Sequence, residues 1–141
     1  MKNQIIKIVI LVCFSIFATV YAQEGVPSCK NIPGQEYPKI LPDNRVVFRV
    51  RAPEATSVVV DLNGRFPMTK DEDGVWHVTT PPVEIGFQYY SLIVNGLAVV
   101  DPATQTFHGM GRMASAVEIP EPGVNFWRTQ NVPHGQVRQF L

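Results

Sequence analysis

The side chains that could do chemistry in this chain are serines, histidines and carboxylates that lie far apart in the sequence. None of Ser57, Ser91 and Ser115 lies in a Gly-x-Ser-x-Gly elbow, the sharp turn that exposes the nucleophile of many serine hydrolases. The histidines lack the close spacing of zinc ligands. They are His77, His108 and His134. We therefore expect no catalytic residue, no metal and no cofactor in this chain.

Two short patterns resemble binding motifs but lack the surroundings that those motifs need. Residues Gly109 to Ala114 match the glycine spacing of a dinucleotide-binding turn, yet no strand–helix–strand unit surrounds them. We expect a flexible loop there, crossing one end of the domain. The acidic run at residues 71–73 lacks the ordered spacing of a calcium-binding loop and predicts a solvated turn. Asp101 is expected to cap the turn that it forms with Pro102.

Aromatic side chains are the remaining groups that could contact a ligand. Sugars present apolar C–H faces that stack on flat rings, while polar neighbours bind the hydroxyl groups. Rings also pack in protein cores, and in a sequence the two roles look alike. Trp76 is expected to pack in the core, where its loss would cost roughly 3–5 kcal/mol. The candidates for glycan-contacting rings are Phe66, His77, Tyr89, Phe107 and Trp127.

The residues from Phe87 to Val94 predict the strand that must position Tyr89. All of these positions are uncharged and rich in aromatic and β-branched types. Asn95-Gly96 follows, and both residues tolerate the positive φ of a type I′ hairpin turn. A short strand after this hairpin is expected to end at Asp101-Pro102.

Four further segments have the composition of half-buried strands. They are Arg45–Ala52, Ser57–Leu62, Val75–Thr80 and Ala114–Ile119. Apolar residues at helical spacing are nearly absent after residue 22. Strands separated by Gly and Pro at intervals of roughly ten residues predict an all-β fold. We expect an immunoglobulin-like β-sandwich of about seven antiparallel strands over residues 44–122.

The amino terminus has the anatomy of a secretory signal peptide, residues 1–22. Basic residues precede an apolar stretch, Ile8–Val20, which is shorter than the roughly 20 residues needed to span a bilayer. Cleavage after Ala22 would make the protein secreted or periplasmic, with no membrane attachment afterwards. The prolines and glycines in residues 23–43 predict an extended arm. Cys29, the one cysteine left after cleavage, is expected to lie exposed on that arm.

The chain that remains after cleavage is close to neutral. Removing Lys2 and Lys7 from the 12 basic residues leaves 10, against 12 acidic residues, which is a net charge of −2. A near-neutral chain without a basic stripe argues against nucleic acid as a partner. With one cysteine no internal disulfide can form, so the stability must come from packing.

A set of motifs across residues 44–102 resembles a known family. The motifs are Gly74-Val75-Trp76, the strand Gly86–Val94, the hairpin Asn95-Gly96 and the pair Asp101-Pro102. They are similar to the family 48 carbohydrate-binding modules, early-set immunoglobulin-like domains that precede catalytic domains in many glycan-processing enzymes. The resemblance implies the sandwich fold. It does not extend to starch or glycogen binding, because Ser91 replaces the sugar-contacting Lys and Leu97-Ala98 replaces the Trp after the hairpin.

Four segments carry a second and closer resemblance. They are GQEYPKILPDNRVVFRV, YYSLIVNG, the segment Gly109–Pro120 and VPHGQV. Together they resemble the amino-terminal region of exported bacterial esterases of the feruloyl or acetyl-xylan type, in which a catalytic α/β-hydrolase domain follows directly. This implies that residues 123–141 are a linker and the start of such an esterase domain, and that this chain is a non-catalytic accessory module.

The resemblance leaves two functions open. In the first, the module packs on the esterase domain, or presents plant cell-wall polysaccharide to it, and the parent protein is a carboxylic ester hydrolase that degrades xylan. Apolar side chains at the carboxyl-terminal end would then dock on that domain. The docking candidates are Met110, Met113, Phe126 and Phe140, with Trp127 and Leu141 beside them. In the alternative, the chain is an independent immunoglobulin-like glycan-binding or adhesion module.

Overall fold

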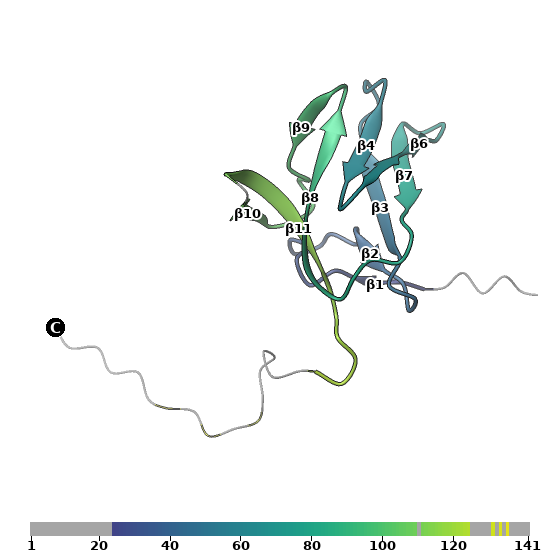
Figure 1. The fold of residues 1–141 in the computed structure, drawn as a ribbon. Coiled ribbons are helices and arrows are strands. Elements are labelled where there is room, and N and C mark those ends of the chain that lie inside the picture. The colour runs from purple at the N-terminus through teal and green to yellow at the C-terminus, as the bar shows by residue number, and fades with distance from the viewer. Residues whose placement is uncertain (1–23, 110, 125–130, 132, 134, 136–141) are drawn as a thin grey trace, which may run out of the picture.

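Two antiparallel β-sheets packed face to face form the part of the chain that the computed structural model describes, residues 24–109, 111–124, 131, 133 and 135 (Figure 1). These residues contain no helix, and hence none long and apolar enough to cross a membrane. The predicted all-β sandwich is confirmed. It contains short strands of two or three residues that the sequence did not predict.

The first sheet has five strands in the order β1-β2-β3-β7-β6. They are β1 (Val26–Pro27), β2 (Lys39–Ile40), β3 (Val46–Arg51), β7 (Val75–Thr79) and β6 (Thr69–Lys70). The second sheet has the order β10-β11-β8-β4-β5, with β9 paired to the far end of β8. Its strands are β10 (Thr106–Gly109), β11 (Arg112–Ile119), β8 (Gly86–Val94), β4 (Val58–Asp61), β5 (Arg65–Pro67) and β9 (Leu97–Val99).

Alternation of side chains decides which face of each strand is buried, because successive residues point to opposite sides of a sheet. In β3, Val46 and Phe48 are fully buried while Arg49 and Arg51 are exposed. In β8, Tyr90 and Leu92 are buried in the core, and Val94 on the same side of the strand packs against it. The strand predictions at Arg45–Ala52, Ser57–Leu62, Val75–Thr80 and Ala114–Ile119 are confirmed within one or two residues of their ends.

The core lies between the two sheets and combines residues from both. Phe48 of β3 meets Tyr90 of β8 edge to face, with ring centroids 4.9 Å apart. Trp76 of β7 is 7% exposed and its indole N–H donates to the Ala52 carbonyl at 2.9 Å, so the expected packing role of this ring is confirmed. The buried cluster comprises Val46, Phe48, Ala55, Val58, Val60, Leu62, Met68, Trp76, Tyr90, Leu92, Val117 and Ile119.

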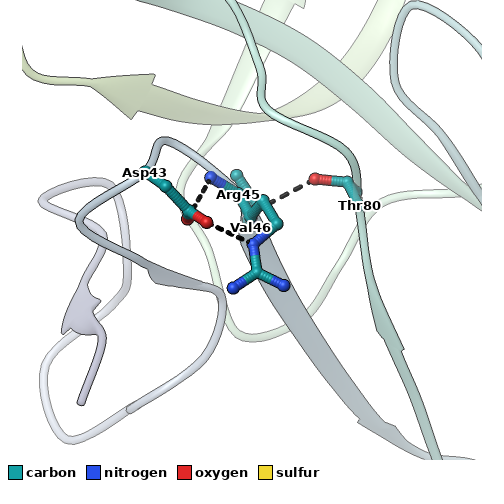
Figure 2. A network of polar contacts seen from close by, with 4 residues as sticks. All are labelled: Asp43, Arg45, Val46 and Thr80. Atoms are coloured by element: carbon teal, nitrogen blue, oxygen red, sulfur yellow. Dashed lines mark hydrogen bonds and ion pairs between the residues drawn. The ribbon is translucent and has the colours of Figure 1, made fainter. Parts of the chain in front are cut away.

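Two reciprocal hydrogen bonds join the start of β3 to the residue that follows β7; Figure 2 shows the one to the Thr80 side chain. The Val46 N–H donates to the Thr80 hydroxyl at 3.0 Å, and the Thr80 N–H donates back to the Val46 carbonyl at 2.9 Å. Beside them, Arg45 Nε donates to the Asp43 carboxylate at 2.6 Å. Thr80 is buried, so these two bonds satisfy polar groups that water does not reach.

The hairpin between β8 and β9 turns at Asn95 and Gly96, whose φ angles of 49° and 88° fit the predicted type I′ turn. The Asn95 side chain also reaches back to β4. Its Oδ1 accepts hydrogen bonds from the backbone N–H groups of Thr56 at 2.9 Å and Ser57 at 3.1 Å. One side chain therefore joins the hairpin turn to the start of the neighbouring strand.

The segment predicted to be an extended arm is folded onto the sandwich. Within residues 24–43, β1 pairs with β2 and β2 pairs with β3, so this segment supplies two strands of the five-stranded sheet. Farther along it, Asn31 forms a bridge with Thr104, and the Ile32 N–H donates to the Ala103 carbonyl at 3.0 Å. Pro27 lies in an edge strand, where a residue without an N–H is tolerated.

The segment predicted to be a flexible loop, Gly109 to Ala114, is instead a β-hairpin. β10 ends at Gly109 and β11 begins at Arg112, and the two strands pair antiparallel. Gly111 has a φ of 76°, a left-handed conformation that glycine adopts at no steric cost. The glycines that resemble a dinucleotide motif therefore belong to a tight strand connection.

Candidate functional site

Three aromatic rings gather on the outer face of the six-stranded sheet. Phe87 stands edge-on to Tyr89, with centroids 5.0 Å apart, and edge-on to Phe107, with centroids 5.1 Å apart. Phe87 is 39% exposed and Tyr89 is 37% exposed. We call the outer surface of β8, β10 and β11 that carries these rings the ring face. A cluster of exposed aromatic side chains on a sheet is a ready contact surface for a ligand or another domain.

Small residues under the rings explain why they can lie across the sheet. Tyr89 is paired with Ala116 of β11, and Phe107 is paired with Ala114 of the same strand. Both alanines are buried, Ala116 completely, although they are on the outer side of the sheet. Gly109 completes this floor, because a Cβ atom there would lie 2.6 Å from Cζ of the Tyr89 ring. The alanines and the glycine thus leave room for the rings.

An ion pair borders the ring face. Lys30 Nζ lies 2.6 Å from the Glu118 carboxylate and 5.6 Å from the centroid of the Phe87 ring. The hydrogen bond from Lys30 lowers the pKa of Glu118, and the same bond raises the pKa of Lys30. Both groups therefore stay charged near neutral pH. They supply a donor and an acceptor beside an apolar ring, the combination that sugar hydroxyl groups require.

Cys29 lies next to this ion pair. It is exposed, as predicted, and its thiol donates to Glu118 Oε2 at 3.5 Å. Partial burial raises the pKa of this thiol, and the Glu118 charge adds to the rise while Lys30 opposes it. The thiol is therefore held in its protonated, less nucleophilic form near neutral pH.

The structure brings together two of the five predicted glycan-contacting residues, Tyr89 and Phe107. Phe66 lies apart from them, in a groove of about 530 Å³ that Gln88 and Asn63 also line. His77 is exposed on the opposite side of the sandwich, on the outer face of β7. Trp127 lies outside the described residues. Phe87 joins the site although the sequence reading did not single it out, and its position two residues before Tyr89 is the signal that could have found it.

The predicted docking residues are described only in part. Met113 of β11 is 49% exposed, so it is available for contact. Met110, Phe126 and Phe140 lie outside the described residues, as do Trp127 and Leu141.

The outer face of the five-stranded sheet differs from the ring face. Arg49 of β3 pairs with His77 of β7, which pairs in turn with Thr69 of β6, and all three are exposed. The ring of Tyr37 lies between two cations, 4.9 Å from Lys39 Nζ and 5.9 Å from Arg49 Cζ. We call this surface the polar face.

A buried polar network ties β8 to β11. The Tyr90 hydroxyl donates to Asp101 Oδ2 at 2.7 Å, and the Asp101 N–H donates to the Ser115 hydroxyl at 2.7 Å. Asp101 Oδ1 accepts from the Ala103 N–H at 2.8 Å, which confirms the predicted cap of this turn. Burial raises the pKa of Asp101, and burial together with the Asp101 charge raises the pKa of Tyr90 well above its ordinary value.

Asp71, in the acidic run at residues 71–73, serves the turn in which it lies. Asp71 Oδ1 accepts from the N–H groups of Asp73 at 3.0 Å and Val75 at 2.8 Å, so it caps the turn that precedes β7. Within residues 24–109, 111–124, 131, 133 and 135, no group of three His, Cys, Asp or Glu side chains could hold a metal ion.

Comparison with known proteins relates the chain to part of a larger enzyme. It is 38% identical over 123 residues to a Xylanibacter ruminicola protein named endo-1,4-beta-xylanase/feruloyl esterase. The match covers 83% of this chain but only 17% of that protein, so the chain spans a small fraction of its relative. No protein-family model matches the chain.

Parts of two solved structures also overlap with the fold. One is described as an α-amylase from Salmonella typhimurium, with a TM-score of 0.49 and 26% identity over 65% of this chain and 16% of that one. Another is pullulanase type I from Bacillus subtilis str. 168 in complex with maltose, with a TM-score of 0.47 and 21% identity over 79% of this chain and 15% of that one. The chain is a small β-sandwich similar to a region of a multidomain glycan-active enzyme.

Proposed function

We propose that this chain is a non-catalytic accessory module of a secreted carbohydrate esterase, and that its ring face contacts xylan of the plant cell wall. The observation that supports this most is the surface cluster of Phe87, Tyr89 and the half-buried Phe107 beside the Lys30–Glu118 ion pair. Flat rings match the apolar faces of xylose units. The charged pair can exchange hydrogen bonds with the sugar hydroxyl groups.

The similarity to a xylanase/feruloyl esterase supports xylan rather than an α-glucan as the polymer. A starch-binding module of family 48 would need a Lys at the position of Ser91 and a Trp at the position of Leu97-Ala98, and this chain has neither. The signal peptide expected at residues 1–22 belongs to the same proposal, because a bacterium meets plant cell walls outside the cell. Docking on the esterase domain through the carboxyl-terminal end, including Met113, is the second role of the module.

Retention on insoluble polysaccharide tests the proposal. We expect the purified chain to sediment with insoluble xylan and to stay in solution with granular starch, which serves as the matched control. If the fraction of the chain retained on xylan is no larger than the fraction retained on starch, the result would argue for an immunoglobulin-like module with another role.

The gene should also continue past the codon for Leu141 into a hydrolase domain with a Gly-x-Ser-x-Gly elbow. A reading frame that lacks one would favour the independent glycan-binding or adhesion module.

A further inference from the structure

A second concave site lies beside the ring face. It is a pocket of about 540 Å³ between the β1–β2 edge of one sheet and the end of β11 in the other. Its lining is mainly apolar and comes from Val26, Pro27, Ile40, Leu41, Pro120 and Pro122. We call it the end pocket. Its volume is in the range that holds small organic ligands, and burial of an apolar ring in such a lining is favourable.

Polar side chains complete the lining of the end pocket. They are Cys29, Lys30, Asn44, Glu118 and Glu121. The Glu118 carboxylate is ionised near neutral pH and can accept a hydrogen bond from a phenol, a charge-assisted bond that is stronger than one between neutral groups. A ligand with an aromatic ring and a hydroxyl group therefore fits both parts of the lining.

The same ion pair joins the end pocket to the ring face. Lys30 lies over the Phe87 ring at 5.6 Å from its centroid, and its partner Glu118 is paired across the strands with Phe87. A polysaccharide chain that lies on the ring face would thus pass beside the mouth of the pocket. A side group on that chain could enter the pocket while the main chain stays on the rings.

We propose that the end pocket accepts the aromatic acyl group of an esterified xylan, a hydroxycinnamoyl group such as feruloyl, carried by a main chain that lies on the ring face. The inference rests on the proposed function and adds to it the chemical class of the side group. It makes the module selective for the esterified stretches of the polymer. Those are the stretches on which a feruloyl esterase would act.

The experiment compares two ligands that differ only in the acyl group. One is a xylo-oligosaccharide that carries a single feruloyl ester, and the other is the same oligosaccharide after saponification. Titration calorimetry with the purified chain should show at least fivefold tighter binding of the feruloylated ligand. Equal affinities would overturn the inference and leave the proposed function standing.

Charged substitutions at the mouth of the end pocket test whether the feruloyl group binds there. Val26 is 69% exposed and Pro122 is also exposed, so a chain with both Val26→Asp and Pro122→Asp keeps its core. We expect it to bind the saponified ligand normally and to lose the fivefold preference. Leu97→Asp is the matched control, since Leu97 is 71% exposed on β9 and should leave the preference intact. A preference that survives in the double variant would overturn the inference.

Methyl ferulate separates a failure of the pocket from a failure of polymer binding. If neither oligosaccharide binds, the proposed function fails, and amide NMR shifts with methyl ferulate alone then decide the inference. Shifts confined to residues around Val26, Leu41 and Glu118 would support the pocket. A spectrum unchanged at millimolar methyl ferulate, or changed only on the ring face, would overturn it.

Discussion

The two outer faces of the sandwich are both built from antiparallel strands but differ in what lies beneath their side chains. On the ring face, Ala114 and Ala116 are buried under aromatic rings from the strands on both sides. On the polar face, Arg49 and His77 project from neighbouring strands into solvent. The small residues of β11 therefore mark a surface that gathers rings, while charged and polar side chains dominate the polar face.

This difference shows that a surface ring alone does not define a site. Tyr37 lies on the polar face, where its ring makes cation–π contacts with Lys39 and Arg49. Phe87 lies on the ring face, where it touches two other rings and a single cation. What distinguishes the second arrangement is a group of three adjoining rings bordered by a paired donor and acceptor, which suits a carbohydrate.

The largest expected effect is a difference in folding stability between substitutions on the two sides of β8, where the adjacent residues Tyr89 and Tyr90 face opposite ways. Tyr90→Phe removes the hydroxyl that donates to the buried Asp101 carboxylate, and should lower the free energy of unfolding by about 2 kcal/mol. Tyr89→Phe, on the ring face, should change it by less than about 0.5 kcal/mol. Urea denaturation of both variants measures the difference. Similar losses would show that the inner network is no more important than the outer surface.

The same network predicts a dependence on alkaline pH. Burial, aided by the Asp101 charge, raises the pKa of Tyr90 well above 10.0 in the folded state. Above pH 10 an unfolded chain has lost the tyrosine proton that the folded chain keeps, so stability should fall as the pH rises. Below that pH the contribution is fully present. The Tyr90→Phe variant should lack this part of the decline, and equal declines in both proteins would contradict the assignment.

The next largest effect is on the affinity for a xylo-oligosaccharide, which should depend on the ring face and not on the polar face. Phe87→Ala combined with Tyr89→Ala removes most of the ring surface and should weaken binding of a xylo-oligosaccharide at least tenfold, or about 1.4 kcal/mol. Arg49→Ala combined with His77→Ala on the polar face is the matched control and should leave the affinity unchanged. Calorimetry gives both values. If the polar-face variant lost more affinity than the ring-face variant, the assignment of the two faces would be reversed.

The smallest expected effect tests whether the small residues under the rings matter for oligosaccharide binding. Gly109→Ala places a Cβ atom 2.6 Å from the Tyr89 ring, so the ring must move from its position across the sheet. We expect roughly threefold weaker binding of the oligosaccharide, a cost below the tenfold step of about 1.4 kcal/mol. His108→Ala, at an exposed neighbouring position of β10, should have no effect. Unchanged affinity in the glycine variant would mean that the position of Tyr89 does not matter.

The sequence predicted the strands whose residues alternate over five or more positions, such as β3 and β8. It missed β1, β2, β5, β6 and β10, all of two to four residues, because runs this short seldom carry a readable period. The three-residue β9 was instead predicted from the Asn95-Gly96 hairpin before it. The missed strands form through pairing with neighbours that are already in place. The arm at residues 24–43 shows this, since its proline-rich composition predicts an extended chain while its partners place it in a sheet.

The candidate site was predictable only in its parts. Tyr89 and Phe107 were singled out as rings, but their meeting depends on the register of β8, β10 and β11. The polar border could not be predicted, because Cys29 and Glu118 are 89 residues apart in the sequence. Phe66 and His77 were equally reasonable by residue type. The fold places each of them on a different surface.

The hydrogen bonds that Asn95 Oδ1 accepts from Thr56 and Ser57 bear on which side chains of β8 lie on the ring face. A slip of β8 by one residue against β4 would turn every side chain of the strand over, so that Tyr89 would point inward and Tyr90 outward. The bonds from Asn95 favour the alignment that also buries Tyr90 and Leu92. An amide group in the hairpin turn thereby helps to select which of two consecutive tyrosines is presented to the outside.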